Sequence, residues 1–241
     1  MANLDSITVK SPCPLCEGTD VAAFAWVNGR SYLECRVCRL VFLLPAERPG
    51  AGEERARYEE HRNDPQDPSY RAFLDRLCAP LVERLAPGAR GLDYGSGPGP
   101  TLSVMLEERG FPTEVYDPYF APDPAVLRRT YDFVTCTETV EHFFAPGREF
   151  STLGGLLRPG GLLAVMTEVL EGQRFEEWHY VRDPTHVAFY RDSTLRWIAG
   201  AHGWDLERPH RNVALFRKGE GATGTHLPRE RILSHRDADR R

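Results

Sequence analysis

Hydrophobic and polar positions follow two alternating patterns between residues 89 and 218. Short apolar runs that predict strands are followed by segments with the i, i+3, i+4 spacing of amphipathic helices. The expected strands are "ARGLDY", "TEVYD", "YDFVTC", "LLAVMT", "WDLE" and "NVALFR". The expected helices are "TLSVMLEERG", "GREFSTLGGLLRPGG", whose Pro-Gly-Gly run is the expected stop, and "DSTLRWIAGAHG". Strand–helix alternation with short connections predicts an α/β fold built on a mostly parallel, doubly wound sheet.

A longer helical pattern precedes the first of these strands. The apolar positions of "SYRAFLDRLCAPLVERLAPG" follow the helical spacing, and Cys78 belongs to that stripe, so we expect it in the core. Ser69 is the expected N-cap, and Pro87 with Gly88 is the expected stop. Residues 46–68 are polar and rich in proline, glycine and charge, which predicts a linker with room for one short helix. Its run "EERARYEE" is interpreted as a solvated face.

Four of the six cysteines form two C-x2-C pairs that are separated by 18 residues. This spacing predicts one zinc ion held in a tetrahedral shell of thiolates by Cys13, Cys16, Cys35 and Cys38. Because the protein fills all four positions, the zinc is expected to be structural rather than catalytic. Two other interpretations are possible. A disulfide framework is less favoured because no secretory signal is visible, and a redox C-x2-C pair is less favoured because two such pairs occur at this spacing. Cys136 lies inside a predicted strand and is expected in the core.

The pattern divides the chain into four segments. Residues 1–45 are expected to form the zinc module, which is too small to hold a core without the metal. Residues 46–88 are expected to be a linker and a helix that packs on the main domain. Residues 89–218 are the sheet domain, and the polar tail at residues 219–241 is expected to be largely disordered.

Composition adds three expectations about the environment of the chain. Its 241 residues are 41% hydrophobic and 27% charged, as in ordinary globular proteins. A formal net charge of −5 argues against a large nucleic-acid surface. No apolar run reaches the roughly 18 residues of a membrane span, and the N-terminus lacks the apolar segment of a secretory signal. We therefore expect a cytoplasmic protein with no membrane partner.

The stretch "LDYGSGPGP" after the first predicted strand of the sheet is a nucleotide-binding signal. Gly95, Gly97 and Gly99 are spaced G-x-G-x-G, which differs from the dinucleotide pattern G-x-G-x-x-G. Asp93 precedes the turn, and Asp117 ends the next strand, where a carboxylate can accept both ribose hydroxyls. Phosphoryl transfer is not expected, because no P-loop lysine follows. The structural alternative is that the glycines only make a tight strand–helix turn.

These residues resemble the class I S-adenosylmethionine-dependent methyltransferases. The motifs "LDYGSGPG", "VYDPYF", "YDFVTCTETVEHF" and "LLRPGGLLAV" occur in that family's order over about residues 85–217. The resemblance implies a Rossmann-like sheet that binds S-adenosyl-L-methionine and transfers its methyl group. The implied cofactor-binding residues are Asp93, Gly95, Gly97, Gly99, Asp117 and Glu138. The cysteine-containing N-terminus similarly resembles the zinc ribbons that precede such domains in bacterial methyltransferases.

One segment departs from the family pattern. Between Asp117 and Tyr131 the family usually has a helix and a third strand that ends in an adenine-binding acid. Only "PYFAPDPAVLRRT" is available in this chain, so we expect the third strand to be short or absent. Asp123 is the candidate substitute for the adenine-binding acid.

Two segments that leave strands at the carboxyl edge of the sheet are expected to face the acceptor, because ligands bind at that edge. The first is "TETVEHF", which contains His142, and the second is the loop at residues 168–190. His186 is the predicted general base, His142 is the second candidate, and Asp183 is expected to orient the imidazole of His186. The structural alternatives are that His142 bonds the backbone, that Asp183 and His186 lock the loop, and that the aromatic residues of the loop only pack.

Three functional hypotheses follow. The first is methyl transfer to a small or medium-sized metabolite at an oxygen, nitrogen or carbon atom. The alternative is an RNA- or protein-modifying enzyme whose zinc ribbon docks the macromolecule, since Arg30, Arg36 and Arg39 lie in that module beside several acids. The third is a cofactor-binding domain without transfer activity, which the residues of the acceptor loop make less favoured. A small-molecule acceptor is therefore expected in preference to nucleic acid.

Overall fold

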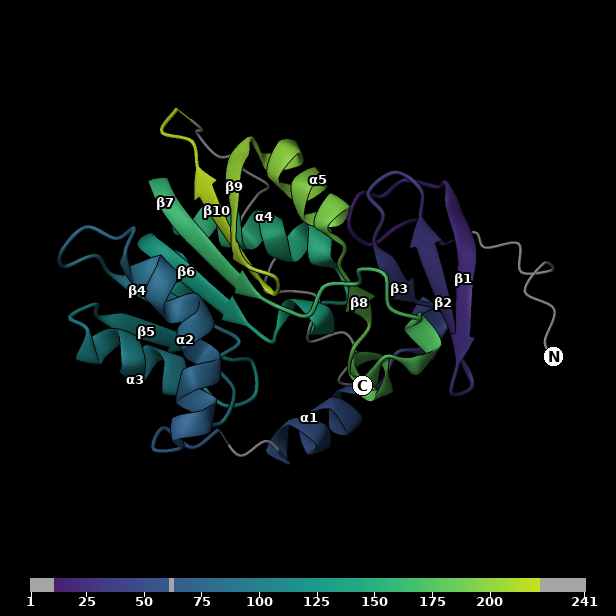
Figure 1. Ribbon diagram of the computed structural model, residues 1–241, viewed down its shortest axis with the longest axis horizontal. Helices are drawn as coiled ribbons and strands as arrows, with labels where there is room; N and C mark the ends of the chain where they lie inside the picture. Colours follow the sequence, from purple (N-terminus) through teal and green to yellow (C-terminus); the bar gives the residue numbers. More distant parts are fainter. Residues whose placement is uncertain (1–10, 61–62, 222–241) are drawn as a thin grey trace.

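Two β-sheets and the helices around them make up the computed structural model, which describes residues 11–60 and 63–221 (Figure 1). The main sheet has six strands in the order β5-β4-β6-β7-β10-β9. Its first four strands are parallel, and β10 pairs antiparallel with both β7 and β9. The strands are Gly91–Tyr94 (β4), Thr113–Tyr116 (β5), Tyr131–Thr137 (β6), Leu157–Met166 (β7), Trp204–His210 (β9) and Val213–Lys218 (β10). The predicted α/β fold is confirmed.

Helices cover both faces of the main sheet. One face packs against α2 and α3, and the other against α4 and α5, so that two apolar cores enclose the sheet. These helices are Pro68–Val82 (α2), Thr101–Glu108 (α3), Pro146–Leu156 (α4) and Asp192–His202 (α5). Cys78 and Cys136 are buried in these cores, as predicted. Both-face coverage is what a doubly wound parallel sheet requires, because neither of its faces is polar.

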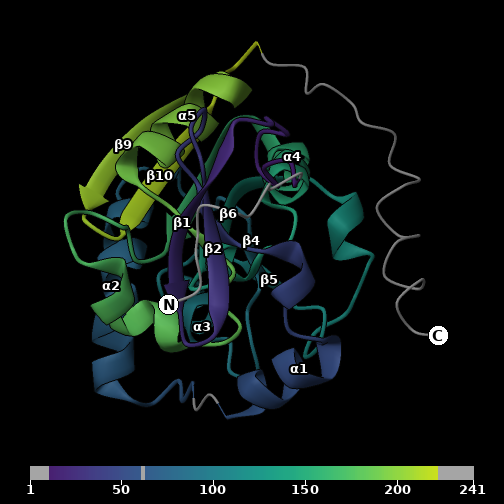
Figure 2. The same cartoon turned by 90° about the vertical axis from the view of Figure 1, so that its right-hand side faces the viewer.

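A second, smaller sheet stands beside the first in Figure 1 and in front of it in Figure 2. Its antiparallel strands are Val21–Val27 (β1), Arg30–Cys35 (β2) and Val41–Leu43 (β3). A fourth strand, Ala188–Phe189 (β8), comes from the long loop after β7 and pairs with β3. Phe175 of the same loop packs between the rings of Tyr32 and Phe189, each with its centroid 5.0 Å away. The N-terminal module and the loop at residues 168–190 therefore share one core.

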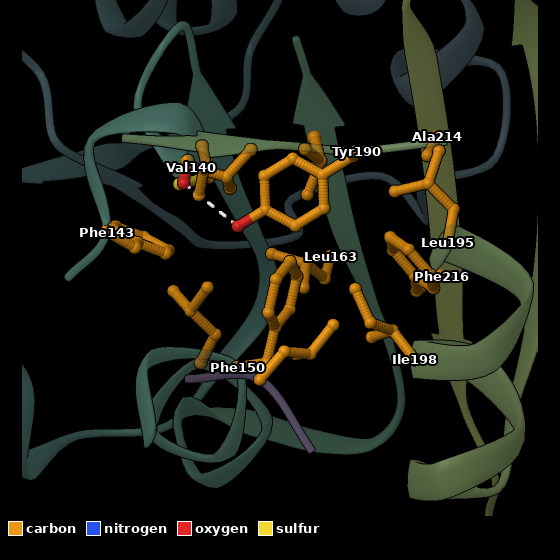
Figure 3. Close-up of a cluster of buried hydrophobic side chains, with 14 of the residues drawn as sticks. Val140, Phe143, Phe150, Leu163, Tyr190, Leu195, Ile198, Ala214 and Phe216 are labelled. Atoms are coloured by element: carbon orange, nitrogen blue, oxygen red, sulfur yellow. Dashed lines mark hydrogen bonds between the residues drawn. The ribbon is translucent and has the colours of Figure 1, made fainter. Parts of the chain in front are cut away.

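The end of this loop is fixed to the main domain as well. Tyr190 is fully buried and donates a hydrogen bond to the carbonyl of Val140 at 2.9 Å (Figure 3). Trp178 and Tyr180 are also buried, as the packing interpretation expects, but Tyr180 does more than pack, because its hydroxyl lies 3.1 Å from that of Thr167. Because Val140 begins the turn Val140–His142, the loop and the segment after β6 form one wall.

Several element ends differ from the sequence prediction. The N-cap of α2 is Asp67, whose carboxylate accepts the N–H of Ser69 at 2.8 Å, so the prediction of Ser69 as N-cap was wrong. Helix α4 ends at Leu156 and β7 begins at the next residue, so the Pro-Gly-Gly run that was expected to stop the helix belongs to the strand. The run lies at a register shift of the ladder between β6 and β7, after the pair of Tyr131 with Leu157 and before the pair of Phe133 with Leu162.

The segment after β5 has no third strand. A single bridge between Asp117 and Ala121 and the short 3-10 turn Val126–Arg128 are the regular features between β5 and β6, all of them described residues. The expectation that this strand is short or absent is confirmed. Across residues 11–60 and 63–221, no helix is long and apolar enough to cross a bilayer. The tail predicted to be disordered lies outside the described residues from residue 222 onward.

Candidate active site

A long groove follows the carboxyl edge of the parallel strands. Its lining includes every cofactor-binding and catalytic residue predicted from the sequence, namely Asp93, Gly95, Gly97, Gly99, Asp117, Glu138, His142, Asp183 and His186. These residues come from four separate segments of the chain, at residues 93–99, 117, 138–142 and 183–186. The topology of a parallel sheet brings them together, because the carboxyl ends of parallel strands meet at one edge.

The glycine turn between β4 and α3 needs glycine for two reasons. Gly95 and Gly97 have φ values of 79° and 65°, a backbone conformation that side chains disfavour. A Cβ on Gly95 would lie 2.2 Å from Cγ2 of Thr139, and one on Gly99 would lie 2.0 Å from the carbonyl oxygen of Asn63. The turn is therefore packed closely against the segment after β6 and against the connection between the helix Ala51–Glu59 (α1) and α2.

Asp117, which follows β5, connects the glycine turn to the end of that strand by a hydrogen bond. Its carboxylate accepts the N–H of Gly97 at 3.0 Å, of Tyr119 at 2.8 Å and of Phe120 at 3.1 Å. A carboxylate has about four lone-pair sites, so Asp117 retains capacity for a ligand hydroxyl. This is the position from which the second-strand acid is expected to hold a ribose.

Asp93 is a buried acid at the end of β4. It accepts a hydrogen bond from the hydroxyl of Thr135 at 2.7 Å, and the described residues bring no cation to it. Burial raises the pKa of Asp93 to about 6, although the hydrogen bond from Thr135 opposes that rise. A ligand ammonium group beside this carboxylate would supply the missing positive charge.

Buried polar atoms without partners gather along the same edge. Among the described residues, eight buried side-chain nitrogen or oxygen atoms have no hydrogen-bond partner. Four of them line the groove: Ser96 Oγ, Thr137 Oγ1, Glu138 Oε1 and Glu141 Oε1. Leaving such an atom unpaired costs about 1–3 kcal/mol, so their concentration in one place indicates a polar ligand. The residues present therefore fit a cofactor that offers an ammonium group and several hydroxyls.

A network of buried acids forms the deep wall of the groove. Thr167 donates its hydroxyl to Glu141 at 2.9 Å and lies 3.1 Å from the hydroxyl of Tyr180, which in turn donates to Glu138 at 3.4 Å. Burial raises the pKa of Glu141 to about 7 and that of Glu138 well above its ordinary range. Glu138 also has a positive φ of 48°, which is uncommon for a residue other than glycine and occurs often at functional sites.

His142 and His186 stand side by side at the same wall, with ring centroids 4.8 Å apart. Nδ1 of His142 lies 3.0 Å from the carbonyl oxygen of Thr185, and Nδ1 of His186 lies 2.7 Å from that of Tyr180. Because a carbonyl can only accept, both Nδ1 atoms carry hydrogen, and in the neutral rings the lone pair is on Nε2. The backbone bond that was the structural alternative for His142 is therefore present.

Asp183 fixes the loop that carries His186. Its carboxylate accepts the N–H and the hydroxyl of Thr185 at 2.9 Å and 2.6 Å, and it pairs with Arg57 of α1 at 2.9 Å. Burial alone would raise the pKa of Asp183, but these donors and the nearby His186 outweigh it, so the pKa lies below its ordinary range. At Nδ1 the ring of His186 is oriented by the carbonyl of Tyr180. An orienting role for Asp183 stays a prediction.

Sequence reasoning missed the contribution of the linker. The helix Ala51–Glu59 (α1) lies between the two sheets, and the ring of Tyr58 contacts that of His142 edge-on with the centroids 5.2 Å apart. Arg57 reaches Asp183 from the same helix. The run interpreted as a solvated face is mostly exposed, but its residues Glu54 and Tyr58 line the groove. The available signal was a single aromatic residue within a run of charges.

The four paired cysteines belong to the small-sheet module and do not line the groove, although Glu17, next to Cys16, does. The sulfurs of Cys13 and Cys38 are 3.4 Å apart, and those of Cys16 and Cys35 are 3.5 Å apart. All four sulfurs lie within 4.8 Å of one another. Sulfurs bound to one zinc ion at about 2.3 Å are separated by about 3.8 Å, so the cluster has nearly the size of such a site.

The fold and the groove together define a class of enzyme. In the parallel part of the sheet, β4 is followed by a glycine turn and carries a buried acid near its end. An acid after β5 accepts a hydrogen bond from that turn, and acid–base groups follow β6 and β7. This is the architecture of the class I S-adenosylmethionine-dependent methyltransferases.

Comparison with known proteins gives the same answer. A family model described as "Methyltransferase domain" matches residues 70–208, more than half of the chain. The chain therefore belongs to this methyltransferase family and is an S-adenosylmethionine-dependent methyltransferase. A comparison with curated proteins found no match.

The chain is similar to two solved methyltransferase structures, of which the first supports the fold. One is the 1,6-didemethyltoxoflavin-N1-methyltransferase of Burkholderia thailandensis, with 1,6-didemethyltoxoflavin and S-adenosylhomocysteine bound. Its sequence is 18% identical, the match covers 82% of this chain and 99% of that one, and the TM-score is 0.54. The other is the magnesium protoporphyrin IX methyltransferase of Synechocystis PCC 6803, with S-adenosylhomocysteine bound. Its sequence is 15% identical, the match covers 70% and 95% of the two chains, and the TM-score is 0.48.

Proposed function

We propose that this enzyme transfers the methyl group of S-adenosylmethionine to an oxygen, nitrogen or carbon atom of a small or medium-sized metabolite. The observation that carries the proposal is one groove that joins a cofactor cradle at β4 and β5 to a wall of buried acid–base groups beyond β6 and β7. The toxoflavin enzyme, which shares the fold, acts on a small heterocycle, and this supports a small acceptor. The net charge of −5 also favours a metabolite over nucleic acid.

On the cofactor side, Asp93 would bind the methionyl ammonium and Asp117 the ribose hydroxyls. Gly95, Gly97 and Gly99 would let the backbone approach the cofactor closely. Glu138, at the end of β6, would contact it from the neighbouring strand. When bound, S-adenosylmethionine supplies a methyl group that its sulfonium already activates, so the chain has only to align the nucleophile and handle its proton.

On the acceptor side, His186 and His142 are the candidates to take the nucleophile's proton. Nδ1–H of each ring is held by a carbonyl, so the basic lone pair belongs to Nε2. Tyr58 would cover the acceptor from α1, as its ring contact with His142 suggests.

We also propose that Cys13, Cys16, Cys35 and Cys38 hold one structural zinc ion. The compact sulfur cluster supports this, and so does the small size of the module that the ion would stabilise. In this scheme residues 1–45 are the zinc ribbon, residues 46–88 the connecting segment and residues 89–218 the catalytic domain. Because β8 pairs with β3, the zinc would support the acceptor loop without touching the acceptor.

The experiment that tests the proposal measures cofactor binding and methyl transfer separately. Calorimetry measures the affinity of the proposed cofactor site for S-adenosylhomocysteine. Transfer of a labelled methyl group into small-molecule, RNA and protein fractions of a cell extract identifies the acceptor class. Label in the small-molecule fraction supports the proposal. Label in RNA or protein would favour the docking alternative, and binding without label in any fraction would favour a domain with no transfer activity.

A further inference from the structure

Three side chains on the acceptor wall are arranged as metal ligands. One carboxylate oxygen of Glu141 and one ring nitrogen each of His142 and His186 lie within 4.8 Å of one another. They come from two segments, the turn after β6 and the loop after β7. The N–H of Val187 joins these segments by donating to the carbonyl of Glu141 at 2.8 Å. The cluster is therefore held by the backbone on both sides.

Both imidazoles have the outer contacts that metal-binding histidines usually have. Each Nδ1–H donates to a backbone carbonyl, that of Thr185 for His142 and that of Tyr180 for His186. Such a bond fixes the ring and the tautomer and makes Nε2 a better donor to a metal. The same arrangement is found at both rings, although they belong to different segments.

Glu141 provides the second, independent observation. Its side chain is fully buried, and Oε2 accepts the hydroxyl of Thr167, which orients the carboxylate. Oε1 is buried and has no hydrogen-bond partner among the described residues, although the residue lines the groove. A cation bound between Oε1 and the two imidazoles would satisfy this oxygen.

We propose that Glu141, His142 and His186 bind a divalent transition-metal ion, such as Zn²⁺, Co²⁺ or Fe²⁺, separate from the four-cysteine site. Two imidazoles and one carboxylate suit these ions and leave coordination positions for other ligands. If the proposed acceptor site is correct, an oxygen of the acceptor would occupy one of these positions. In this arrangement the metal, and not Nε2 of His142 or His186, would activate the acceptor. It would lower the pKa of a coordinated hydroxyl, whose proton would leave along the groove to solvent. The acceptor would then be a metabolite with an ionisable hydroxyl group.

The test uses the full-length protein, first loaded with zinc and dialysed. Elemental analysis is expected to give about two metal ions per chain for the wild type and about one for Glu141→Gln, whose amide keeps the size of the side chain. His186→Asn is expected to give the same loss. His179→Asn, a change at an exposed histidine of the same loop, is expected to retain both ions.

Titration with Co²⁺ identifies the site. Protein whose cysteine site already holds zinc should bind one further Co²⁺ without the absorption of cobalt–thiolate bonds, and Glu141→Gln should abolish this binding. One ion per chain in the wild type, or loss of the second ion in His179→Asn as well, would overturn the inference. Binding of S-adenosylhomocysteine is measured on the same samples. If it persists and methyl transfer occurs without a second metal, the metal site is refuted while the proposed function stands.

Discussion

Replacing Asp93 by asparagine separates the contribution of this residue to folding from its contribution to cofactor binding. In the folded chain burial raises the pKa of Asp93 from its ordinary 3.8 to about 6. The folded state therefore binds the proton more tightly than the unfolded state. Stability from this group is fully present below pH 3.8 and is lost as the pH rises toward 6. The loss amounts to about 3 kcal/mol in total, at about 1.4 kcal/mol per pH unit.

Roughly half of that loss, about 1.4 kcal/mol, falls between pH 5 and pH 7.5. Asparagine does not titrate, so the free energy of unfolding of Asp93→Asn should rise relative to wild type by this amount over that range. Cofactor affinity of the wild type should depend on pH in the opposite direction and increase as the pH rises, because the ammonium group of the cofactor binds the ionised carboxylate of Asp93. For the wild type it should fall about tenfold from pH 7.5 to pH 5, while the variant should show little change.

The assays are denaturant unfolding and calorimetry with S-adenosylhomocysteine, both at several pH values. At pH 7.5 the variant should bind the ligand about 10- to 150-fold more weakly, the equivalent of the 1.5–3 kcal/mol that a charged hydrogen bond contributes. Effects of acid on the cysteine cluster are shared by both proteins and cancel in the comparison. Identical pH dependence of the two proteins, in unfolding or in binding, would refute the reasoning about Asp93.

Three further predictions concern the remaining parts of the site. Asp117→Ala should weaken binding of S-adenosylhomocysteine by about 1–3 kcal/mol, and binding that calorimetry finds unchanged would remove Asp117 from the cofactor site. His186→Asn should reduce turnover by about 10²–10⁴-fold with cofactor affinity nearly unchanged, whereas His179→Asn should not; turnover that survives within a few-fold would make His186 structural. Cys35→Ser should lower the zinc content below one ion per chain and the thermal midpoint with it, and a metal-free wild type that is fully folded would contradict the zinc assignment.

The sequence predicted the cofactor side of the site best. The glycine turn and the acids at Asp93 and Asp117 are local features, and their position at one sheet edge follows from the strand–helix alternation alone. The missing third strand could also be predicted, because 13 residues between Pro118 and Thr130 cannot hold both a helix and a strand.

The acceptor side could not be predicted in the same way, because it depends on contacts between distant segments. Strand β8 has only two residues, too few for any periodic pattern, and it forms because β3 offers an edge. The packing of Tyr58 against His142 likewise depends on tertiary structure, since α1 has no apolar face. The carbonyls that orient the two histidines are backbone groups, which leave no trace in the sequence.

The most direct test of the central claim is to follow a labelled methyl group from S-adenosylmethionine into separated fractions of a cell extract, with wild type and His186→Asn in parallel. We predict that wild type labels the small-molecule fraction. The variant should label it about 10²–10⁴-fold more slowly while it binds S-adenosylhomocysteine as wild type does. Label that appears only in RNA or protein, at equal rates for both proteins, would contradict this account of the acceptor site.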